Sequence, residues 1–211
     1  MAHREGVIGF ELDHRRQRLA DEDLSHGGRL LVWRRILRRR KLLGQAAHRY
    51  EGLGYGNLSR RLPPWQAPPG ERAFLITASQ TSGLPDLTAE HWSRVAAWKL
   101  GGHSLVSVGE GLPSSESLSH AALYDRSPEV RAVFHIHSPP LWNYALAEGW
   151  PATLPSAANG TPELALALRE LEAPWPAGVI VLAGHEDGLL AYGRSEDEAG
   201  GKLLAALRLA I

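Results

Sequence analysis

Two histidines placed two residues apart offer the first sign of chemistry in this chain. They are His135 and His137, inside the apolar run AVFHIHS of residues 132–138. On a β-strand, residues i and i+2 point to the same face, so the two imidazoles can converge on one point. Burying two imidazoles without partners is costly, which favours a ligand role over core packing. A functional site would also need a third ligand, an acid or base, and a substrate cradle.

A second group of polar residues stands just upstream, in PSSES at residues 113–117. Ser114 and Ser115 are adjacent hydroxyls ahead of an expected helix, where O–H and backbone N–H groups can hold an anion such as phosphate. A plain helix cap is the alternative reading. Glu116 follows at once, and a carboxylate beside a metal is a natural general base or a further ligand.

Two glycine-containing loops could complete a cradle. They are GYGNLS at residues 54–59 and TSGLPDLT at residues 81–88, and each combines glycine with small hydrogen-bonding side chains. Such loops let the backbone approach a phosphate closely. Taken singly, each is also ordinary turn chemistry.

The composition limits the classes of protein to be considered. Of 211 residues, 44% are hydrophobic and 22% are charged, as in a globular protein. The formal net charge is zero, which gives no support to nucleic-acid or membrane-surface binding. Without a signal peptide, a membrane-length apolar run or any cysteine, we expect a cytoplasmic protein that holds any metal through His, Asp or Glu.

Hydrophobic periodicity predicts the elements that must position these residues. We expect a loose arm over residues 1–27, with one short strand at VIGFEL, and a single mixed α/β domain over residues 28–211. Helices are expected over 28–50, from about 89, and over 117–126, 139–149, 161–171 and 195–211; strands are expected at 74–79, 104–108 and 130–138, with a hairpin over 177–193.

The helix expected after Gly28 carries a run of arginines: Arg34, Arg35, Arg38, Arg39 and Arg40. A basic run of this kind can bind nucleic acid. Here the charges lie between apolar positions, so we interpret them as a solvated helix face.

The order of the pieces is more specific than any one of them. GNLS, ITASQTSG, PSSE, the histidine pair and a GH…GLLAYG hairpin follow one another as in the class II aldolase/adducin family. The chain resembles that family from about residue 28 to residue 208. The resemblance implies a three-layer α/β/α sandwich around a largely antiparallel sheet. It also implies a divalent metal held by three histidines, usually Zn²⁺ with Mn²⁺, Fe²⁺ or Co²⁺ as alternatives, and a homotetramer with active sites at subunit interfaces.

Carried over by position, the resemblance assigns roles to the quoted motifs. His135 and His137 match metal ligands, and Glu116 matches the carboxylate that moves a proton next to the substrate carbonyl. The positions that match the phosphate cradle are Gly56, Asn57, Ser82, Gly83, Ser114 and Ser115. The implied activity is that of a metal-dependent lyase, an aldolase acting on a small sugar phosphate such as fuculose phosphate.

The third metal ligand is where the chain departs from the family pattern of a His-Gly-Leu run. The sequence reads GHEDGL at residues 184–189, so the ligand is either His185 in a longer turn or Asp187. We favour His185, because a neutral nitrogen matches the pair and a longer turn costs little. The loop TASQTSG is also longer than the usual family loop, which leaves two readings open: a reshaped phosphate end, or a substrate that carries a carboxylate instead of a phosphate. His103, His120 and Tyr192 are possible additional site residues.

Other functions within the same fold remain open. A ribulose-phosphate 4-epimerase typically carries aspartate where Glu116 stands. A methylthioribulose-phosphate dehydratase usually places its catalytic glutamate after the histidine pair. A non-catalytic, adducin-like binding module has typically lost the metal histidines, so metal content would separate it from an enzyme.

Overall fold

The computed structural model describes residues 8–210 and contains one central sheet of eight strands. The strands are β1 (Glu11–Arg16), β4 (Asn57–Arg61), β5 (Phe74–Thr77), β6 (Trp92–Lys99), β7 (Ser104–Gly109), β8 (Ala132–His137), β9 (Gly178–Val181) and β10 (Gly188–Gly193). Their order is β1-β7-β6-β5-β4-β8-β10-β9. Only the β1–β7 pair is parallel, so the sheet is largely antiparallel. A small separate ribbon pairs β2 (Gly44–Gln45) with β3 (Gly54–Tyr55).

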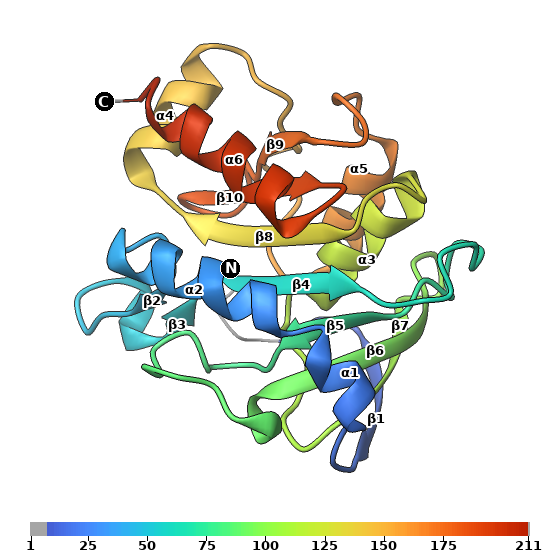
Figure 1. Ribbon diagram of the computed structural model, residues 1–211. Coiled ribbons are helices and arrows are strands. Elements are labelled where there is room, and N and C mark those ends of the chain that lie inside the picture. Colours follow the sequence, from blue (N-terminus) through green and yellow to red (C-terminus); the bar gives the residue numbers. More distant parts are fainter. Residues whose placement is uncertain (1–7, 211) are drawn as a thin grey trace.

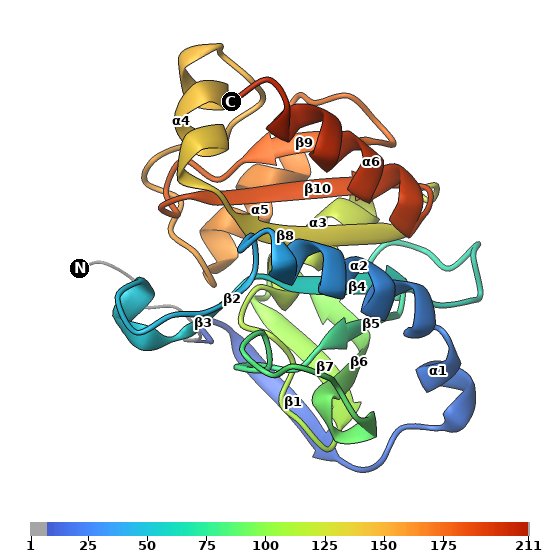
Figure 2. The same ribbon diagram turned by 60° about the vertical axis from the view of Figure 1, so that its left-hand side comes forward.

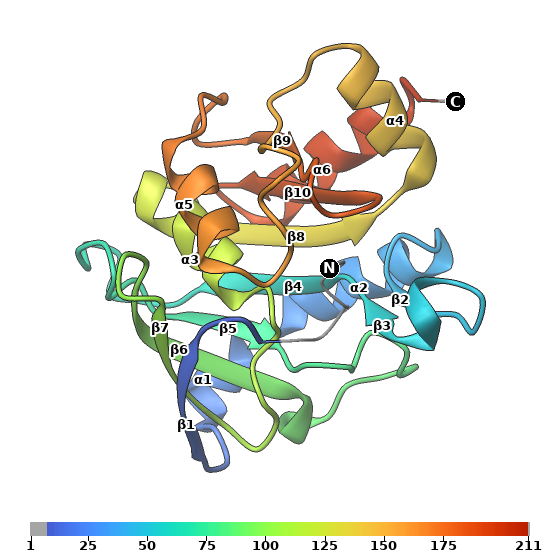
Figure 3. The same cartoon turned by 180° about the vertical axis from the view of Figure 1, so that it is seen from behind.

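Helices cover both faces of the sheet, which gives the expected α/β/α sandwich. The helices are α1 (Asp21–Ser25), α2 (Gly28–Arg39), α3 (Ser117–Arg126), α4 (Pro139–Ala147), α5 (Pro162–Glu170) and α6 (Glu196–Leu207). Helices α2 and α6 lie in front of the sheet in Figure 1, and α3 and α5 lie in front in the reverse view of Figure 3. None of the helices within residues 8–210 is long and apolar enough to cross a bilayer.

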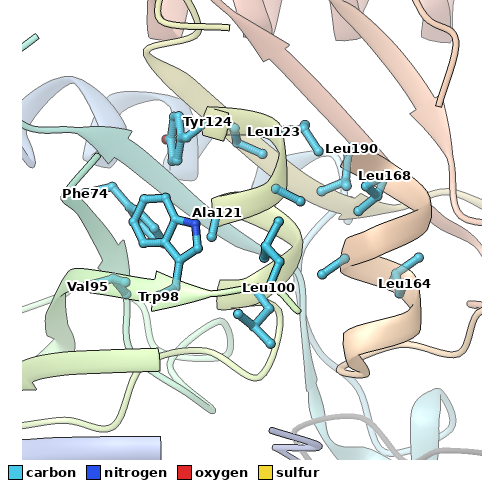
Figure 4. Close-up of a cluster of buried hydrophobic side chains, with 14 of the residues drawn as sticks. Phe74, Val95, Trp98, Leu100, Ala121, Leu123, Tyr124, Leu164, Leu168 and Leu190 are labelled. Carbon is cyan, nitrogen blue, oxygen red and sulfur yellow. The ribbon is translucent and has the colours of Figure 1, made fainter. Parts of the chain in front are cut away.

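The strand that carries the histidine pair is buried on both faces. Val133 packs into the core on the α3 and α5 side, whereas Phe134 and Ile136 pack into the core on the α2 and α6 side. Because side chains alternate along a strand, His135 and His137 share the face of Val133. Figure 4 shows the core beneath α3 and α5, in which aromatic and leucine side chains from the sheet and both helices interlock.

Most of the predicted elements are present. The helix over 117–126 is confirmed as α3, the histidine strand as β8, and the hairpin over 177–193 as the antiparallel pair β9 and β10. The helix expected over 28–50 ends early, at Arg39. Lys41 adopts a left-handed backbone conformation (φ 57°), which an α-helix cannot continue through.

The helix expected from about residue 89 is wrong. Thr88 does cap a helical turn, but that turn is a short 3₁₀ segment, Ala89–His91, and β6 begins at Trp92. Trp92, Val95 and Trp98 are buried from this strand against the two cores. Aromatic and β-branched side chains suit a pleated, half-buried surface, and this preference explains why the segment forms a strand rather than a helix.

The segment expected to be a loose arm over residues 1–27 is partly built into the sheet. β1 pairs in parallel with β7 along its whole length, from Glu11 opposite Ser104 to Arg16 opposite Gly109. The strand expected at VIGFEL therefore starts four residues later, and Val7 lies outside the described residues. α1 follows within the same segment.

The arginine run of α2 is not wholly a solvated face. Arg34 is buried, with 2% of its surface exposed, and its guanidinium lies against a loop more than forty residues away. The expectation of a solvated face is wrong for this residue, because α2 packs between the sheet and that loop. Figure 2 shows α2 along the sheet and the β2–β3 ribbon projecting beyond the strand ends.

Candidate functional site

Three histidines converge at one end of β8. The ring centroid of His185 lies 4.9 Å from that of His135 and 4.7 Å from that of His137, and the His135–His137 distance is 4.9 Å. One ring nitrogen from each side chain lies within 4.8 Å of the other two. All three side chains are buried. The pair read from the sequence thus acquires His185 as a third member.

The turn between β9 and β10 delivers His185 to this point. Its backbone N–H donates to the Leu182 carbonyl (3.0 Å), and its own carbonyl accepts from the Gly188 N–H (2.9 Å). Gly188 is paired directly with His137 in the sheet, which ties the turn to the end of β8. The two additional residues of GHEDG therefore form a tight turn that points the imidazole at the pair.

The backbone around β8 settles the tautomer of His135. Its Nδ1 lies 3.2 Å from the Leu189 carbonyl, which can only accept, so Nδ1 carries the proton. Burial, followed by the nearby His185 and His120, lowers the pKa of His135 well below its ordinary value. The imidazole is therefore neutral at physiological pH and presents a bare Nε2, the state in which histidine binds a metal.

The geometry fits a divalent cation bound by nitrogen. The Nε2 atoms of His135 and His137 are 3.2 Å apart. A tetrahedral zinc ion binds imidazole nitrogens at about 2.0–2.1 Å, which places two such nitrogens roughly 3.3–3.4 Å apart. Burial lowers the pKa of His137 as well, with His185 the next cause. These two nitrogens, together with one from the His185 ring, could hold a metal, and the fourth position would be open to a substrate oxygen.

Glu116 stands next to the histidine cluster at the start of α3. Its side chain is 1% exposed, and one carboxylate oxygen, Oε1, lies 3.9 Å from Nδ1 of His185. The other, Oε2, accepts a hydrogen bond from the Ser119 hydroxyl (3.2 Å). One turn of α3 thus fixes the carboxylate close to the candidate metal without placing it among the three nitrogens.

A polar pocket extends from Glu116 along the glycine-containing loops. Its lining residues are Gly54, Gly56, Asn57, Ala78, Ser79, Gln80, Thr81, Ser82, Ser114, Ser115 and Glu116. Five of the six positions expected to cradle a phosphate are therefore brought together. The exception is Gly83, which faces the Gln45 side chain, where a Cβ would overlap it. The sequence motifs did not single out Ser79 and Gln80, which the longer TASQTSG loop contributes to the pocket.

Asn57 offers an available polar atom at the junction of pocket and cluster. It lies directly across from His135 in the β4–β8 ladder. It is 8% exposed, and its side-chain oxygen has no hydrogen-bond partner within residues 8–210. A buried carboxamide oxygen normally finds a donor, so a hydroxyl of a bound molecule would satisfy it.

Asp187, the alternative third ligand, is engaged elsewhere. Its Oδ2 accepts a hydrogen bond from the Tyr50 hydroxyl (2.8 Å) and lies 4.0 Å from the Arg49 guanidinium. The Tyr50 ring in turn packs edge-on against His137, with centroids 4.5 Å apart. Burial, then the hydrogen bond to Asp187, raises the pKa of Tyr50, so its phenol stays protonated. Tyr50, Asp187 and Arg49 therefore pack together beside His137, an arrangement that the sequence motifs did not indicate.

The possible additional residues have separate locations. His120 is buried in α3, where its Nδ1 contacts the Ser59 hydroxyl (2.7 Å), and burial lowers its pKa to about 3. Tyr192 donates to the Pro174 carbonyl (2.7 Å), and His103 is exposed in the turn before β7. Of the three, only His120 lies near the cluster: its ring is close enough to His135 to help lower the pKa of that histidine.

Gly56 supports the site through its shape, and replacing it with alanine should damage both stability and metal binding. It has a φ of +77°, and a Cβ there would lie 2.6 Å from Leu43 Cβ and 3.0 Å from the His135 carbonyl oxygen. We expect Gly56→Ala to cost about 2–3 kcal/mol in the free energy of unfolding, measured by urea denaturation. Gly201→Ala is the control: nothing lies within 4 Å of its Cβ in α6, so we expect a gain of up to about 1 kcal/mol. Equal stability of the two variants would contradict this interpretation.

Fold and site together place the chain among α/β sandwich proteins with a candidate metal centre at the end of an interior strand of the central sheet. The chain belongs to the class II aldolase and adducin N-terminal domain family, whose model matches residues 42–210. The family expected from the motifs is thereby confirmed. No curated protein shows a significant sequence match to the chain.

Solved structures share this fold. L-fuculose-1-phosphate aldolase from Thermus thermophilus is 25% identical, with a TM-score of 0.58 and coverage of 86% of this chain and 89% of that one. A sugar-phosphate aldolase from Thermotoga maritima is 18% identical, with a TM-score of 0.65 and coverage of 89% and 93%. YgbL from Escherichia coli, described as a candidate aldolase/epimerase/decarboxylase, is 22% identical, with a TM-score of 0.63 and coverage of 90% and 88%. The last two likenesses concern the fold.

Proposed function

We propose that the chain is a metal-dependent lyase of the aldolase type, acting on a small sugar phosphate or a related aldol substrate. The observation that carries this proposal is the placement of Glu116. Its carboxylate lies 3.9 Å from His185, at the boundary between the three-histidine cluster and the polar pocket. The proposed ligands are His135, His137 and His185, with Zn²⁺ the expected metal.

The proposed chemistry follows from these positions. A divalent cation on the three imidazoles would act as a Lewis acid toward the carbonyl oxygen of the substrate. In the direction of bond formation, Glu116 takes a proton from the carbon next to that carbonyl, leaving an enediolate. That carbon then bonds to the carbonyl carbon of an aldehyde, whose oxygen gains a proton from solvent. In cleavage, the hydroxyl loses its proton to solvent, the same carbon–carbon bond breaks, and Glu116 returns the proton to the carbon.

The substrate would be oriented by the polar pocket. Its proposed anchoring positions are five of the six read from the sequence, Gly56, Asn57, Ser82, Ser114 and Ser115, whereas Gly83 shapes the loop rather than lining the pocket. The side-chain oxygen of Asn57 would accept from a substrate hydroxyl next to the reacting carbon. We also propose a homotetramer, as the family resemblance implies, with small molecules rather than nucleic acid or membranes as partners.

Metal removal and a substrate screen test the proposal. We expect the purified protein to contain about one divalent metal per chain by elemental analysis. Chelation should abolish aldol cleavage of phosphorylated sugars, including fuculose phosphate, and added Zn²⁺ should restore it. Inversion at C4 without cleavage would identify an epimerase instead. Absence of bound metal, with no activity on adding Zn²⁺, would favour a non-catalytic binding module and would refute the lyase.

A further inference from the structure

A buried arginine lies directly behind the pocket loop. Arg34 of α2 is 2% exposed and donates to the carbonyls of Thr81 (2.8 Å), Leu84 (2.6 Å) and Pro85 (3.2 Å), with a longer contact to that of Ser82 (3.3 Å). The carbonyl of Gly83, which Arg34 does not reach, is held by Arg38, one turn further along the helix. Arg38 donates to this carbonyl (2.9 Å) and shares that of Pro85 (3.2 Å). Every carbonyl from Thr81 to Pro85 is thus held by one of two guanidinium groups.

These contacts determine which way the loop turns its N–H groups. In a trans peptide the C=O and the following N–H point in opposite directions. Because the carbonyls of Thr81 and Ser82 point toward Arg34, the N–H groups of Ser82 and Gly83 point away from it. Neither N–H donates a hydrogen bond to another of residues 8–210. Ser82 itself lines the pocket, so the loop presents donors on the pocket side.

The charge of Arg34 is not neutralised by an ion pair in the described part of the chain. Its hydrogen-bond partners are carbonyl oxygens, and the acidic residue that contributes to its environment, Asp86, pairs with Arg35 at the surface (3.1 Å). Burial lowers the pKa of Arg34 to about 10, which still leaves it protonated at neutral pH. A buried cation without a carboxylate is costly unless something else compensates it.

We propose that Arg34 is a positioning residue and a fixed counter-charge for an anionic group of the substrate, seated between residues 81–82 and 114–115. This inference rests on the proposed function, because it places the substrate in the pocket beside Glu116. It adds that the substrate carries a full negative charge at that end, as a phosphate or a carboxylate. Arg34 acts through the loop: it orients the N–H groups and adds positive potential without touching the ligand.

The test compares two arginines on one helix. In metal-loaded protein, we expect Arg34→Gln to weaken binding of inorganic phosphate about tenfold, measured by calorimetry. Arg35→Gln removes the same charge from a surface position that contacts no loop carbonyl, and should change the affinity less than about twofold. With a cleavable substrate, Arg34→Gln should raise KM far more than it lowers kcat. Unchanged phosphate affinity in folded Arg34→Gln protein with full metal content would overturn the proposal.

Two further experiments address a variant that fails to fold and the chemical kind of the bound anion. If Arg34→Gln does not fold, Arg38→Gln decides, since Arg38 is more exposed and holds two carbonyls of the same loop, those of Gly83 and Pro85. We expect about threefold weaker phosphate binding, and no change would refute the role. Acetate compared with phosphate on the wild type distinguishes a carboxylate from a phosphate seat. A wild type that binds neither would reject the anion site while leaving metal-dependent aldol cleavage intact.

Discussion

Replacement of Glu116 by glutamine should lower kcat by about 10²- to 10⁴-fold, the usual contribution of a positioned general acid or base. Glutamine preserves the size of the side chain and can still accept from the Ser119 hydroxyl, but it cannot take a proton from carbon. Metal content should stay at the wild-type level, because the carboxylate lies beside the three imidazole nitrogens rather than among them. Steady-state kinetics and elemental analysis on the same preparation measure both quantities.

A second measurement isolates the proton transfer. We expect wild-type protein to exchange the hydrogen next to the carbonyl of the ketone product with deuterated solvent, and Glu116→Gln to lose this exchange, as followed by NMR. Glu110→Gln makes the same chemical change at an exposed position just upstream and should leave kinetics and exchange unaltered. Wild-type turnover in Glu116→Gln would remove Glu116 from the mechanism.

Local sequence patterns were sufficient for the parts of the fold whose residues are close in the chain. The helix over 117–126 and the histidine strand were predicted with nearly their observed bounds, because their periodicity and caps lie within one element. The segment after Thr88 was mispredicted as helix. Its identity depends on Trp92 and Trp98 finding cores made by distant elements, and that information is tertiary.

The site divides in the same way. Motif order brought together the histidine pair, Glu116 and most of the pocket. It could not reveal that Arg34 is buried, because the carbonyls that hold it lie 47–51 residues further along the chain. Nor could it show that Asp187 is engaged by Tyr50, 137 residues away in sequence. From the sequence alone, a charged residue is interpreted as surface charge when its partners are distant in the chain.

The proposed third metal ligand, His185, gives the second prediction of large effect. We expect His185→Ala to lower the metal affinity by at least 10- to 100-fold and to lose activity as a result. Removing a residue that only hydrogen-bonds to a metal ligand already costs that much, and removing the ligand itself should cost no less. Asp187→Asn should retain metal, because the Asp187 side chain lies with Tyr50 and Arg49 rather than within the histidine cluster. Asparagine is a matched replacement, since it keeps an oxygen acceptor for Tyr50 and tolerates the left-handed backbone of residue 187 (φ 63°).

Competition with a chromogenic chelator would measure the metal affinity of each variant, with circular dichroism to verify that it is folded. His48→Ala removes an exposed histidine and should bind metal as the wild type does, so it controls for loss of any imidazole. Loss of metal in Asp187→Asn with retention in His185→Ala would reverse the assignment and make the site a two-histidine, one-carboxylate centre. Because carboxylate ligation lowers the net charge of a metal site, that centre would be a weaker Lewis acid toward a substrate carbonyl. The identity of the third ligand therefore bears directly on how well this protein could stabilise an enediolate.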